Sequence, residues 1–421
     1  MLSRTKQQLK QGKTLITFTS LQATGEALGM IAPLVVAKFF SEDLFGRYSL
    51  AKMVVFFFTS VLIASAQAPF IVYATQEREK TGRINRSFSV QCVFLVFSII
   101  AFLSLNLIFS KALAAFVGIP PADLTFVSLA FIGIALKTFF SNLFMALGQR
   151  VKSSLAEVVF GSLALAIVLA LCFTGNVNLR TAFFSYFVSG LLVAILSLAT
   201  VDFKLLLPFD FSWGHFKYMF DFTKWVMLGS TAAYFVNWGD NIVLRSFVSM
   251  GDIGEYNLGY QIFKGITMLA FVMNAYFLPF ISERAEDSAR MRNYLFNKRP
   301  KVFLVCLLGV VLVFLFAPTI LKLFYGNTYQ KSATILRVLL VGSVALFYTI
   351  FYYPVLNALK KYKFAQTVSL LQAVLNLALD LVLVPVMGLL GAAVATVFAY
   401  FCWAGAVEVY FRVKIRKLLK S

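Results

Sequence analysis

The chain has 421 residues, of which 60% are apolar and 13% are charged, and its mean hydropathy is +0.83. These values exclude a water-soluble globular protein, because soluble domains contain roughly 45–50% apolar and about 25% charged residues. The net charge of +20 does not require a nucleic-acid partner. Positive residues gather in the cytoplasmic loops of membrane proteins and beside anionic headgroups, so we expect membrane lipids to surround this chain.

Twelve apolar runs follow one another along the chain. A helix needs roughly 20 apolar residues to cross the hydrocarbon core of a bilayer. The runs are residues 14–39, 48–75, 88–109, 124–147, 154–174, 181–201, 222–249, 256–282, 302–324, 333–359, 364–386 and 390–411. We therefore predict an all-α polytopic membrane protein with about twelve transmembrane helices. Residues 1–13 contain no small-residue cleavage site, so we expect the first helix to stay in the mature protein.

The loops between these runs differ in their content of Lys and Arg. When the loops are assigned alternately to two sides, 26 of the 38 cations fall on one side. The segments on that side are the N-terminus, 76–87, 148–153, 202–221, 283–301, 360–363 and the C-terminus from Arg412. Because positive loops favour the cytoplasm, we predict that both termini are cytoplasmic and that loop 110–123 is periplasmic.

The linker 202–221 divides the chain nearly in half, into residues 1–201 and 222–421, with six runs in each half. Residues 45–50 (FGRYSL) in the first half are repeated as residues 253–258 (IGEYNL) in the second, at an offset of 208 positions. An even number of helices gives both halves the same orientation in the membrane. We therefore predict two parallel six-helix bundles joined by a cytoplasmic linker.

Residue patterns typical of enzymes are missing from the sequence. The single histidine, His215, lies in the linker without a nucleophile motif, and the four cysteines lie at wide spacing within apolar runs. The sequence has no Gly-rich phosphate loop and no metal-ligand spacing. We therefore expect neither an enzyme nor a cofactor or metal centre.

Charged residues inside the predicted helices are the remaining candidates for function, because each costs at least a few kcal/mol in hydrocarbon unless it is paired or hydrated. Glu26, Lys137, Asp240 and Lys264 lie deepest. At 100° per residue, the polar residues of the first, seventh, eighth and eleventh runs share one face of each helix. These faces predict a polar, mainly cationic cavity that suits phosphate and sugar groups. Interhelical hydrogen bonding is an alternative explanation for Asn and Gln.

Several segments resemble a known family. They are residues 240–247 (DNIVLRSF), 254–256 (GEY) and 376–385, followed by Gly388, residues 391–393 (GAA) and Thr396. They are similar to polysaccharide transporters of the multidrug/oligosaccharidyl-lipid/polysaccharide (MOP) exporter superfamily, and most of all to O-antigen flippases of the Wzx type. The resemblance implies a MATE-like, V-shaped pair of six-helix bundles in which helices one, two, seven and eight line a central cavity.

The resemblance also implies an activity. This is the transfer of an undecaprenyl-diphosphate-linked oligosaccharide, such as an O-antigen unit, from the cytoplasmic to the periplasmic leaflet of the bacterial inner membrane. The implied mechanism is alternating access driven by an ion gradient.

The predicted site has a substrate-binding part and an ion-coupling part. The residues expected to bind the lipid-linked oligosaccharide are Lys52, Lys137, Arg245, Lys264, Tyr234, Asn237, Asn241 and Tyr260. Glu26, Asp240 and Asp380 are expected to couple transport to a proton or a sodium ion, because a buried carboxylate binds either. A structural ion pair is an alternative role for Asp240, since Arg245 lies about 1.4 turns away on the same helix.

Two other functions remain open at this stage. A multidrug exporter of the same superfamily would share the fold, but its cavity is expected to be acidic or apolar. A membrane polysaccharide polymerase or ligase would need a sizeable periplasmic loop, whereas the longest predicted outer loop, 110–123, is short. We expect a monomer, with at most loose association with other polysaccharide assembly proteins.

Overall fold

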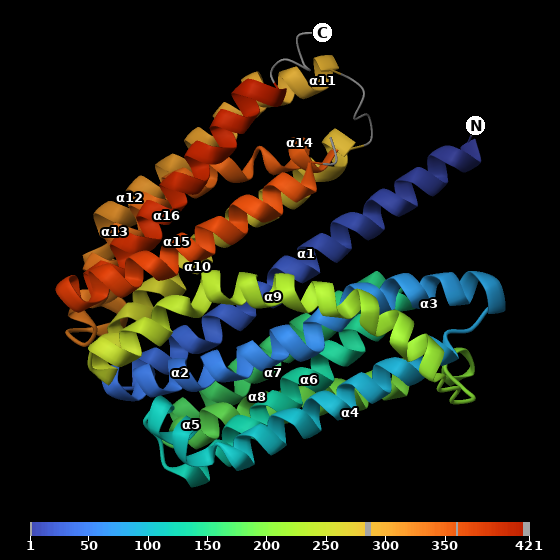
Figure 1. The fold of residues 1–421 in the computed structure, drawn as a ribbon, viewed down its shortest axis with the longest axis horizontal. Coiled ribbons are helices and arrows are strands. Elements are labelled where there is room, and N and C mark those ends of the chain that lie inside the picture. Colours follow the sequence, from blue (N-terminus) through green and yellow to red (C-terminus); the bar gives the residue numbers. More distant parts are fainter. Residues whose placement is uncertain (1, 283–287, 359–360, 416–421) are drawn as a thin grey trace. The chain divides into compact units, whose positions relative to one another are not determined.

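The structure is a computed structural model that describes residues 2–282, 288–358 and 361–415 (Figure 1). Over these ranges the chain is helical and contains no β-strand. A helix satisfies its own backbone N–H and C=O groups, which a chain in hydrocarbon must do. In chain order the helices are α1 (Leu2–Phe39), α2 (Glu42–Phe58), α3 (Gln67–Thr81), α4 (Asn85–Ile108), α5 (Ser110–Val117), α6 (Leu124–Ala146), α7 (Arg150–Phe173), α8 (Leu179–Thr200), α9 (Trp213–Phe247), α10 (Met250–Ser282), α11 (Ser288–Asn293), α12 (Arg299–Tyr325), α13 (Gln330–Ile350), α14 (Tyr353–Ala358), α15 (Tyr362–Met387) and α16 (Leu389–Tyr410).

The twelve predicted apolar runs fall mainly on helical residues wherever the structure describes them, and residue 359, at the end of the tenth run, lies outside the described ranges. Ten helical stretches in the described ranges are long and apolar enough to cross a membrane. The other two predicted spans are α9 and α10, which have 35 and 33 residues and carry two of the predicted polar faces. The structure therefore confirms the predicted class, a polytopic all-α membrane protein.

Helical structure extends further into the predicted loops than expected. α3 continues to Thr81, and α9 already begins at Trp213 within the predicted linker. In the predicted loop 283–301, residues 283–287 lie outside the described ranges. The rest forms α11, a π-helical turn (Tyr294–Lys298) and the start of α12. Hydropathy marks where lipid contact ends, but Arg, Lys, Met and Leu favour continuation of a helix beyond that point.

The second predicted span is not a regular α-helix. Between α2 and α3 the chain forms a π-helical turn (Thr59–Ile63) and then a 3-10 turn (Ala64–Ala66). Pro69 follows in the first turn of α3 and has no N–H group to donate to the carbonyl of Ser65. Such irregular turns interrupt the α-helical ladder of hydrogen bonds in the middle of this span.

The Cα positions group the chain into two compact units. Unit 1 consists of Met1–Phe40 and Arg47–Tyr234, and unit 2 consists of Ser41–Gly46 and Phe235–Ser421. α9 supplies residues to both units. A short segment between α1 and the body of α2 also belongs to unit 2, although the residues on either side of it belong to unit 1.

In unit 1, α1 packs along α7 and α6 packs along α8. Glycines permit close approach of the second pair. A Cβ atom on Gly190 would lie 2.0 Å from the carbonyl oxygen of Gly133, and one on Gly133 would lie 2.4 Å from that of Tyr186. Small residues allow helix backbones to approach in this way in membranes, where dispersion contacts hold the helices together.

The segment that leads into α9 is fastened to the loop between α3 and α4. The Glu77 carboxylate accepts the backbone N–H groups of Arg86 and Ser87 at 2.9 and 2.8 Å. Arg86 forms an ion pair with Asp210 at 2.6 Å, and the Ser87 hydroxyl lies 3.1 Å from Nε2 of His215. The single histidine therefore anchors this segment within unit 1.

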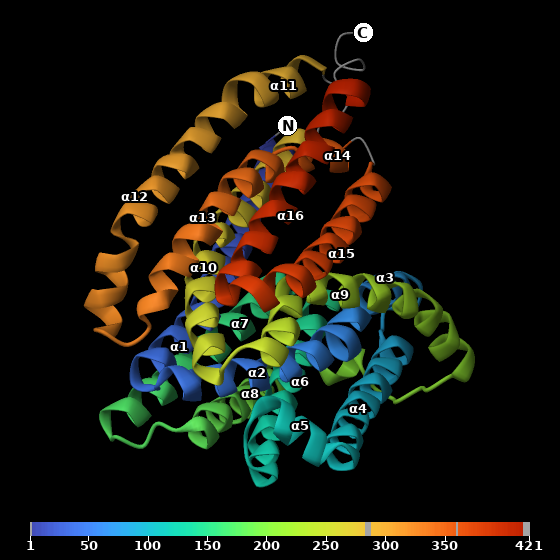
Figure 2. The same cartoon turned by 60° about the vertical axis from the view of Figure 1, so that its left-hand side comes forward.

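In unit 2, neighbouring helices follow one another in the order α12, α13, α16 and α15 (Figure 2). The two glycines of the repeated motif also meet in this unit. A Cβ atom on Gly254 would lie 2.0 Å from the carbonyl oxygen of Glu42, and one on Gly46 would lie 2.0 Å from that of Met250. The repeat seen in the sequence is therefore a backbone-to-backbone contact in the structure.

Candidate functional site

A buried polar cluster in unit 2 is centred on Asp240 of α9. Its carboxylate accepts hydrogen bonds from the Tyr256 hydroxyl of α10, from the Asn376 amide of α15 at 2.6 Å and from the Thr396 hydroxyl of α16 at 3.0 Å. Asn376 also donates to Asp380 at 3.1 Å. All five side chains are buried. We call these five residues the Asp240 cluster; four helices bring them to one point.

Helix geometry explains how these residues meet. Asn376 and Asp380 are four positions apart, so they lie on one face of α15. Between α9 and α10, a second bond lies beside the first, because Asn257 donates to Asn241 at 2.5 Å one residue further along each helix. The predicted site residue Asn241 is therefore buried and engaged with α10.

The two carboxylates of the cluster are bonded by neutral donors, although the Lys264 ammonium group attracts Asp240 without forming an ion pair with it. In the described ranges, the hydrogen-bond donors to Asp240 are the neutral side chains named above, and neither Asp240 nor Asp380 forms an ion pair. Oδ1 of Asp380 is buried and accepts no hydrogen bond. Arg245, the partner considered from the sequence, is therefore not paired with Asp240. Buried negative charge is costly unless it is neutralised, so this cluster calls for a cation or a proton.

The donor atoms of the cluster fit a small hard cation. Carboxylate, amide and hydroxyl oxygens are the ligands that such ions prefer. The NH₂ group of Asn376 faces both carboxylates, but amide orientation follows from the hydrogen-bond partners that are present. A half-turn of this amide would direct its oxygen toward the carboxylates, and the unbonded Oδ1 of Asp380 would supply a further ligand.

One face of α10 leads away from the cluster. Tyr256, Tyr260 and Lys264 are spaced four residues apart, and the first two rings stack with centroids 5.7 Å apart at 14°. The Lys264 ammonium group lies 4.8 Å from the Tyr260 ring and 4.9 Å from the Trp238 ring. Aromatic faces attract a cation, so the two rings hold the Lys264 charge on this face of the helix.

In unit 1, the predicted substrate residue Lys137 lies in a different environment. Its ammonium group forms an ion pair with Glu157 of α7 at 2.8 Å, with exposed side-chain fractions of 14% and 21%. The Phe160 ring lies 5.3 Å from the same nitrogen. The acid and the base here neutralise each other.

Two other predicted residues of unit 1 differ in exposure. Glu26 is exposed on α1 and accepts a hydrogen bond from Gln22 at 3.2 Å, one turn away. Lys52 is buried on α2, with its ammonium group 5.4 Å from the Phe56 ring. Glu26 is therefore not part of the cluster that joins the other two predicted ion-coupling residues.

The remaining predicted residues lie on α9. The hydroxyl of Tyr234 is buried and donates to the Met53 carbonyl at 3.0 Å, which ties α9 to α2 within unit 1. Asn237 is exposed and Arg245 is partly buried. Of the predicted residues of this helix, Tyr234 is thus buried and hydrogen-bonded within the protein, whereas Asn237 is accessible at the surface.

Three members of the Asp240 cluster, namely Tyr256, Asn376 and Thr396, are absent from the predicted site. Tyr256 and Asn376 lie on the predicted polar faces of their helices, so periodicity alone would have placed them beside Lys264 and Asp380. Thr396 has no such signal, because an apolar helix tolerates a single threonine.

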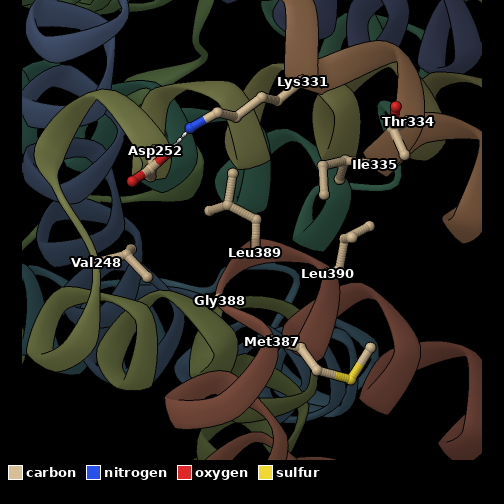
Figure 3. A pocket seen from close by; sticks show the side chains of 9 residues that line it. All are labelled: Val248, Asp252, Lys331, Thr334, Ile335, Met387, Gly388, Leu389 and Leu390. Carbon is tan, nitrogen blue, oxygen red and sulfur yellow. Dashed lines mark hydrogen bonds and ion pairs between the residues drawn. The ribbon is translucent and has the colours of Figure 1, made fainter.

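Unit 2 also contains a cavity of about 380 Å³ (Figure 3). It lies where α9, α10 and α13 end or begin and where α15 turns into α16. An ion pair between Lys331 and Asp252, at 2.6 Å, forms part of its wall. Most of the remaining lining is apolar, and no residue of the predicted site contributes to it.

Comparison with known proteins supplies the family. Residues 35–334, more than half of the chain, match the family described as "Polysaccharide biosynthesis protein". The chain is 22% identical over 185 residues to a Haloferax volcanii protein named "Probable low-salt glycan biosynthesis flippase Agl15", which covers 43% of this chain and 39% of that protein. It is 25% identical over 187 residues to a Shigella flexneri protein named "Putative O-antigen transporter", with 44% of each chain covered. The chain thus aligns with less than half the length of these two curated relatives.

Solved structures supply the fold. A multidrug resistance MATE family transporter of the MOP superfamily matches 97% of this chain and 99% of its own, with a TM-score of 0.75 and 13% identity. The lipid II flippase MurJ matches 96% of this chain and 89% of its own, with a TM-score of 0.76 and 16% identity. Taken with the sequence match, these likenesses show that the chain belongs to the polysaccharide biosynthesis protein family and has the fold of the MOP superfamily.

Proposed function

We propose that this chain is a flippase that carries a lipid-linked oligosaccharide across a membrane, using the energy of an ion gradient. The Asp240 cluster is the observation that carries the proposal, because it holds two buried carboxylates that need a cation. The family supports a glycan substrate. The names of the two relatives, a glycan biosynthesis flippase and an O-antigen transporter, agree with that class.

The proposed coupling site consists of Asp240, Asn376, Asp380 and Thr396. Neutral hydrogen-bond donors do not cancel the charge of the Asp240 and Asp380 carboxylates. A sodium ion or a proton that binds there would neutralise part of that negative charge. The cation would also draw together side chains from α9, α15 and α16, and its release would let these helices separate. We do not include Glu26 in this site, since it lies exposed on α1.

The proposed substrate is an undecaprenyl-diphosphate-linked oligosaccharide, an O-antigen or related surface-polysaccharide unit. Its diphosphate would be bound by Lys264 and Arg245 of unit 2, since cationic side chains are the usual ligands of phosphate groups. Tyr260 and Asn237 would offer a ring face and an amide to the sugars. Lys137 is left out of this group, because Glu157 already holds its ammonium group.

The proposed membrane is the bacterial inner membrane, with both termini in the cytoplasm. Lys and Arg content supports this orientation. Alkaline phosphatase fused after Pro121 is expected to be active, and a fusion near Arg292 is expected to be inactive. The reverse pattern would overturn the orientation.

The transport proposal is tested in vesicles that contain the purified full chain. A fluorescent polyprenyl-diphosphate oligosaccharide is loaded, and dithionite added outside reports the fraction that has changed leaflet. We expect transfer that responds to an imposed sodium or proton gradient. Asp380→Asn should remove the response to the gradient, whereas Asp221→Asn, an exposed residue outside the predicted spans, should leave it intact.

The same assay separates this function from its rivals. Gradient-dependent movement of an organic cation but not of the oligosaccharide would favour multidrug export and sink the proposal. The proposal would also fail if the unmodified chain transferred the oligosaccharide at a rate that depends on neither gradient.

A further inference from the structure

A groove of about 280 Å³ runs between α7 and α8 in unit 1. Its rims are Leu155 of α7 and Leu196 of α8, which are 42% and 55% exposed. Its floor is formed by the smaller, buried side chains of Ala156, Val193 and Ser197. Small residues between large ones leave a furrow, and both helices are membrane-spanning by length and composition.

The polarity of this groove changes along its length. Lys152 and Thr200 lie at one end, where α7 begins and α8 ends. From Lys152 the lining runs along α7 to Val159, which corresponds to about 10 Å at 1.5 Å per residue. Apart from the Ser197 hydroxyl, the lining beyond the charged end is apolar. The groove thus has a cationic mouth and a hydrocarbon interior.

The ammonium group of Lys152 makes one hydrogen bond within the protein. Its ammonium group donates to the Thr200 carbonyl at 3.0 Å, which caps the end of α8, and lies 5.6 Å from the Phe144 ring. In the described ranges no carboxylate forms an ion pair with it. An ammonium group has three N–H donors, so further donors remain for an anion at the mouth.

From this arrangement we infer that the groove is a binding site for an anionic phospholipid. The phosphate group lies at Lys152, and one acyl chain follows the furrow between Leu155 and Leu196. Free phosphate would match the mouth but leave the apolar interior unfilled, so the two-part lining selects a lipid. Loop 148–153 is on the proposed cytoplasmic side, so the lipid comes from the cytoplasmic leaflet. The inference rests on that orientation and not on transport.

The test places a reporter at the rim. Leu155→Trp in the full chain is reconstituted into vesicles of phosphatidylcholine, and brominated phosphatidylglycerol or brominated phosphatidylcholine is titrated in. The quenching of the added tryptophan is obtained by subtracting the signal of the unmodified chain. We expect phosphatidylglycerol to bind at the groove about fivefold more tightly, which is the attraction that one surface cation gives to anionic lipid.

Matched variants decide the outcome. Adding Lys152→Gln should bring the preference to about 1, and Lys152→Arg should retain most of it. Lys80→Gln, an exposed cation on the same proposed side, should change nothing. Ala156→Leu should lower quenching by both lipids because it fills the floor, with helical content by circular dichroism as the check on folding.

Two results would overturn the inference. One is an unchanged preference in the Lys152→Gln variant, or an equal loss in the Lys80→Gln variant, since either would mean general surface attraction. The other is displacement of phosphatidylglycerol by inorganic phosphate alone, which would make the site a phosphate site and not a lipid site.

Discussion

Both units place ionisable side chains inside helices that cross the membrane, but they neutralise the charge differently. In unit 1, Lys137 and Glu157 lie 2.8 Å apart and cancel each other within the protein. In unit 2, Asp240 and Asp380 share Asn376 as a donor and form no ion pair in the described ranges. The first arrangement is an ion pair, whereas we propose that the second is completed by a cation or a proton from solution.

Under the proposed function, this difference separates structural from functional charge within one fold. Charged residues in a membrane span are often taken as functional by default. We propose that, in this protein, the presence of an ion-pair partner distinguishes structural from functional charged residues better than depth in the membrane does. An ion pair within the protein has little net charge and so attracts no further ion, whereas two neighbouring carboxylates attract a cation. The predictions below test whether the two units respond in opposite ways when a charge is removed.

The largest expected effect is the loss of half of the ion pair in unit 1. Glu157→Gln leaves the partly buried Lys137 ammonium group without its partner, which should lower the free energy of unfolding by about 3 kcal/mol, the low end for a buried pair. Thermal unfolding of the purified chain, followed by tryptophan fluorescence, measures it. The double variant Lys137→Met with Glu157→Leu should recover most of the loss, because no uncompensated charge remains. A single variant as stable as the unmodified chain would mean that this pair is hydrated.

A charge removed from unit 2 should have the opposite effect on stability. Asp380→Asn abolishes repulsion between two carboxylates, so stability without added cation should stay equal or rise. Cation affinity should fall by about 100-fold, because a proposed charged ligand is lost and loss of a group that only orients a ligand already costs up to about that much. The thermal shift produced by sodium or by acid gives this affinity. A variant that keeps the full cation-dependent shift would remove Asp380 from the coupling site.

Loss of a neutral donor should have a smaller effect. Thr396→Val keeps the shape of the side chain but removes the hydroxyl that donates to Asp240 at 3.0 Å. The same hydroxyl oxygen is a proposed ligand of the cation, so its loss should lower cation affinity roughly tenfold. Ser343→Ala, at a buried hydroxyl that bonds only to a backbone carbonyl of its own helix, is the control. Equal effects of the two variants would argue against a specific role for Thr396.

The smallest expected effect concerns His215, which lies outside both charged regions and whose pKa is lowered by burial. Burial lowers the pKa of His215 below its ordinary value of 6.5, and the smaller effects of Glu77 and Asp210, which raise it, and of Arg86, which lowers it, leave that direction unchanged. A lowered pKa means that protons favour the unfolded chain. The contribution of this residue to stability is therefore present above pH 6.5 and declines as the pH falls through that value. His215→Gln should flatten the dependence of the unfolding midpoint between pH 7 and pH 5.5, and an unchanged slope would place the titrating group elsewhere.

The fold could be predicted from the sequence because lipid imposes a simple rule on every span. Apolar runs of sufficient length become helices whatever their detailed packing. The ends of the helices could not be predicted equally well. Residues 288–298 are polar and read as a loop, but they form α11 and a π-helical turn that continue into α12. The irregular turns before Pro69 also lack a hydropathy signal.

The site could be predicted only in part, for a geometric reason. Periodicity shows which face of a helix is polar, but it does not show which other helix that face meets. Asp240 and Asp380 are 140 positions apart, and the link between them through Asn376 exists only in the folded chain. The same limit explains Lys137 and Glu157, whose partnership across α6 and α7 turns an expected ligand of the substrate into half of an ion pair. The roles proposed for the individual residues stay predictions until they are tested.

Ser41–Gly46 belong to unit 2, although the residues on either side belong to unit 1, and this has a consequence for folding during synthesis. These six residues leave the ribosome about 200 positions before α10, whose Gly254 they contact, and before Tyr329, whose backbone N–H donates to Glu42 at 3.4 Å. The segment must therefore wait, already inserted beside α1, while most of unit 1 is synthesised. Such long-range contacts slow assembly. If the second half of the chain were produced alone, unit 2 would lack these six residues. Unit 2 is therefore complete only when the first half of the chain is also present.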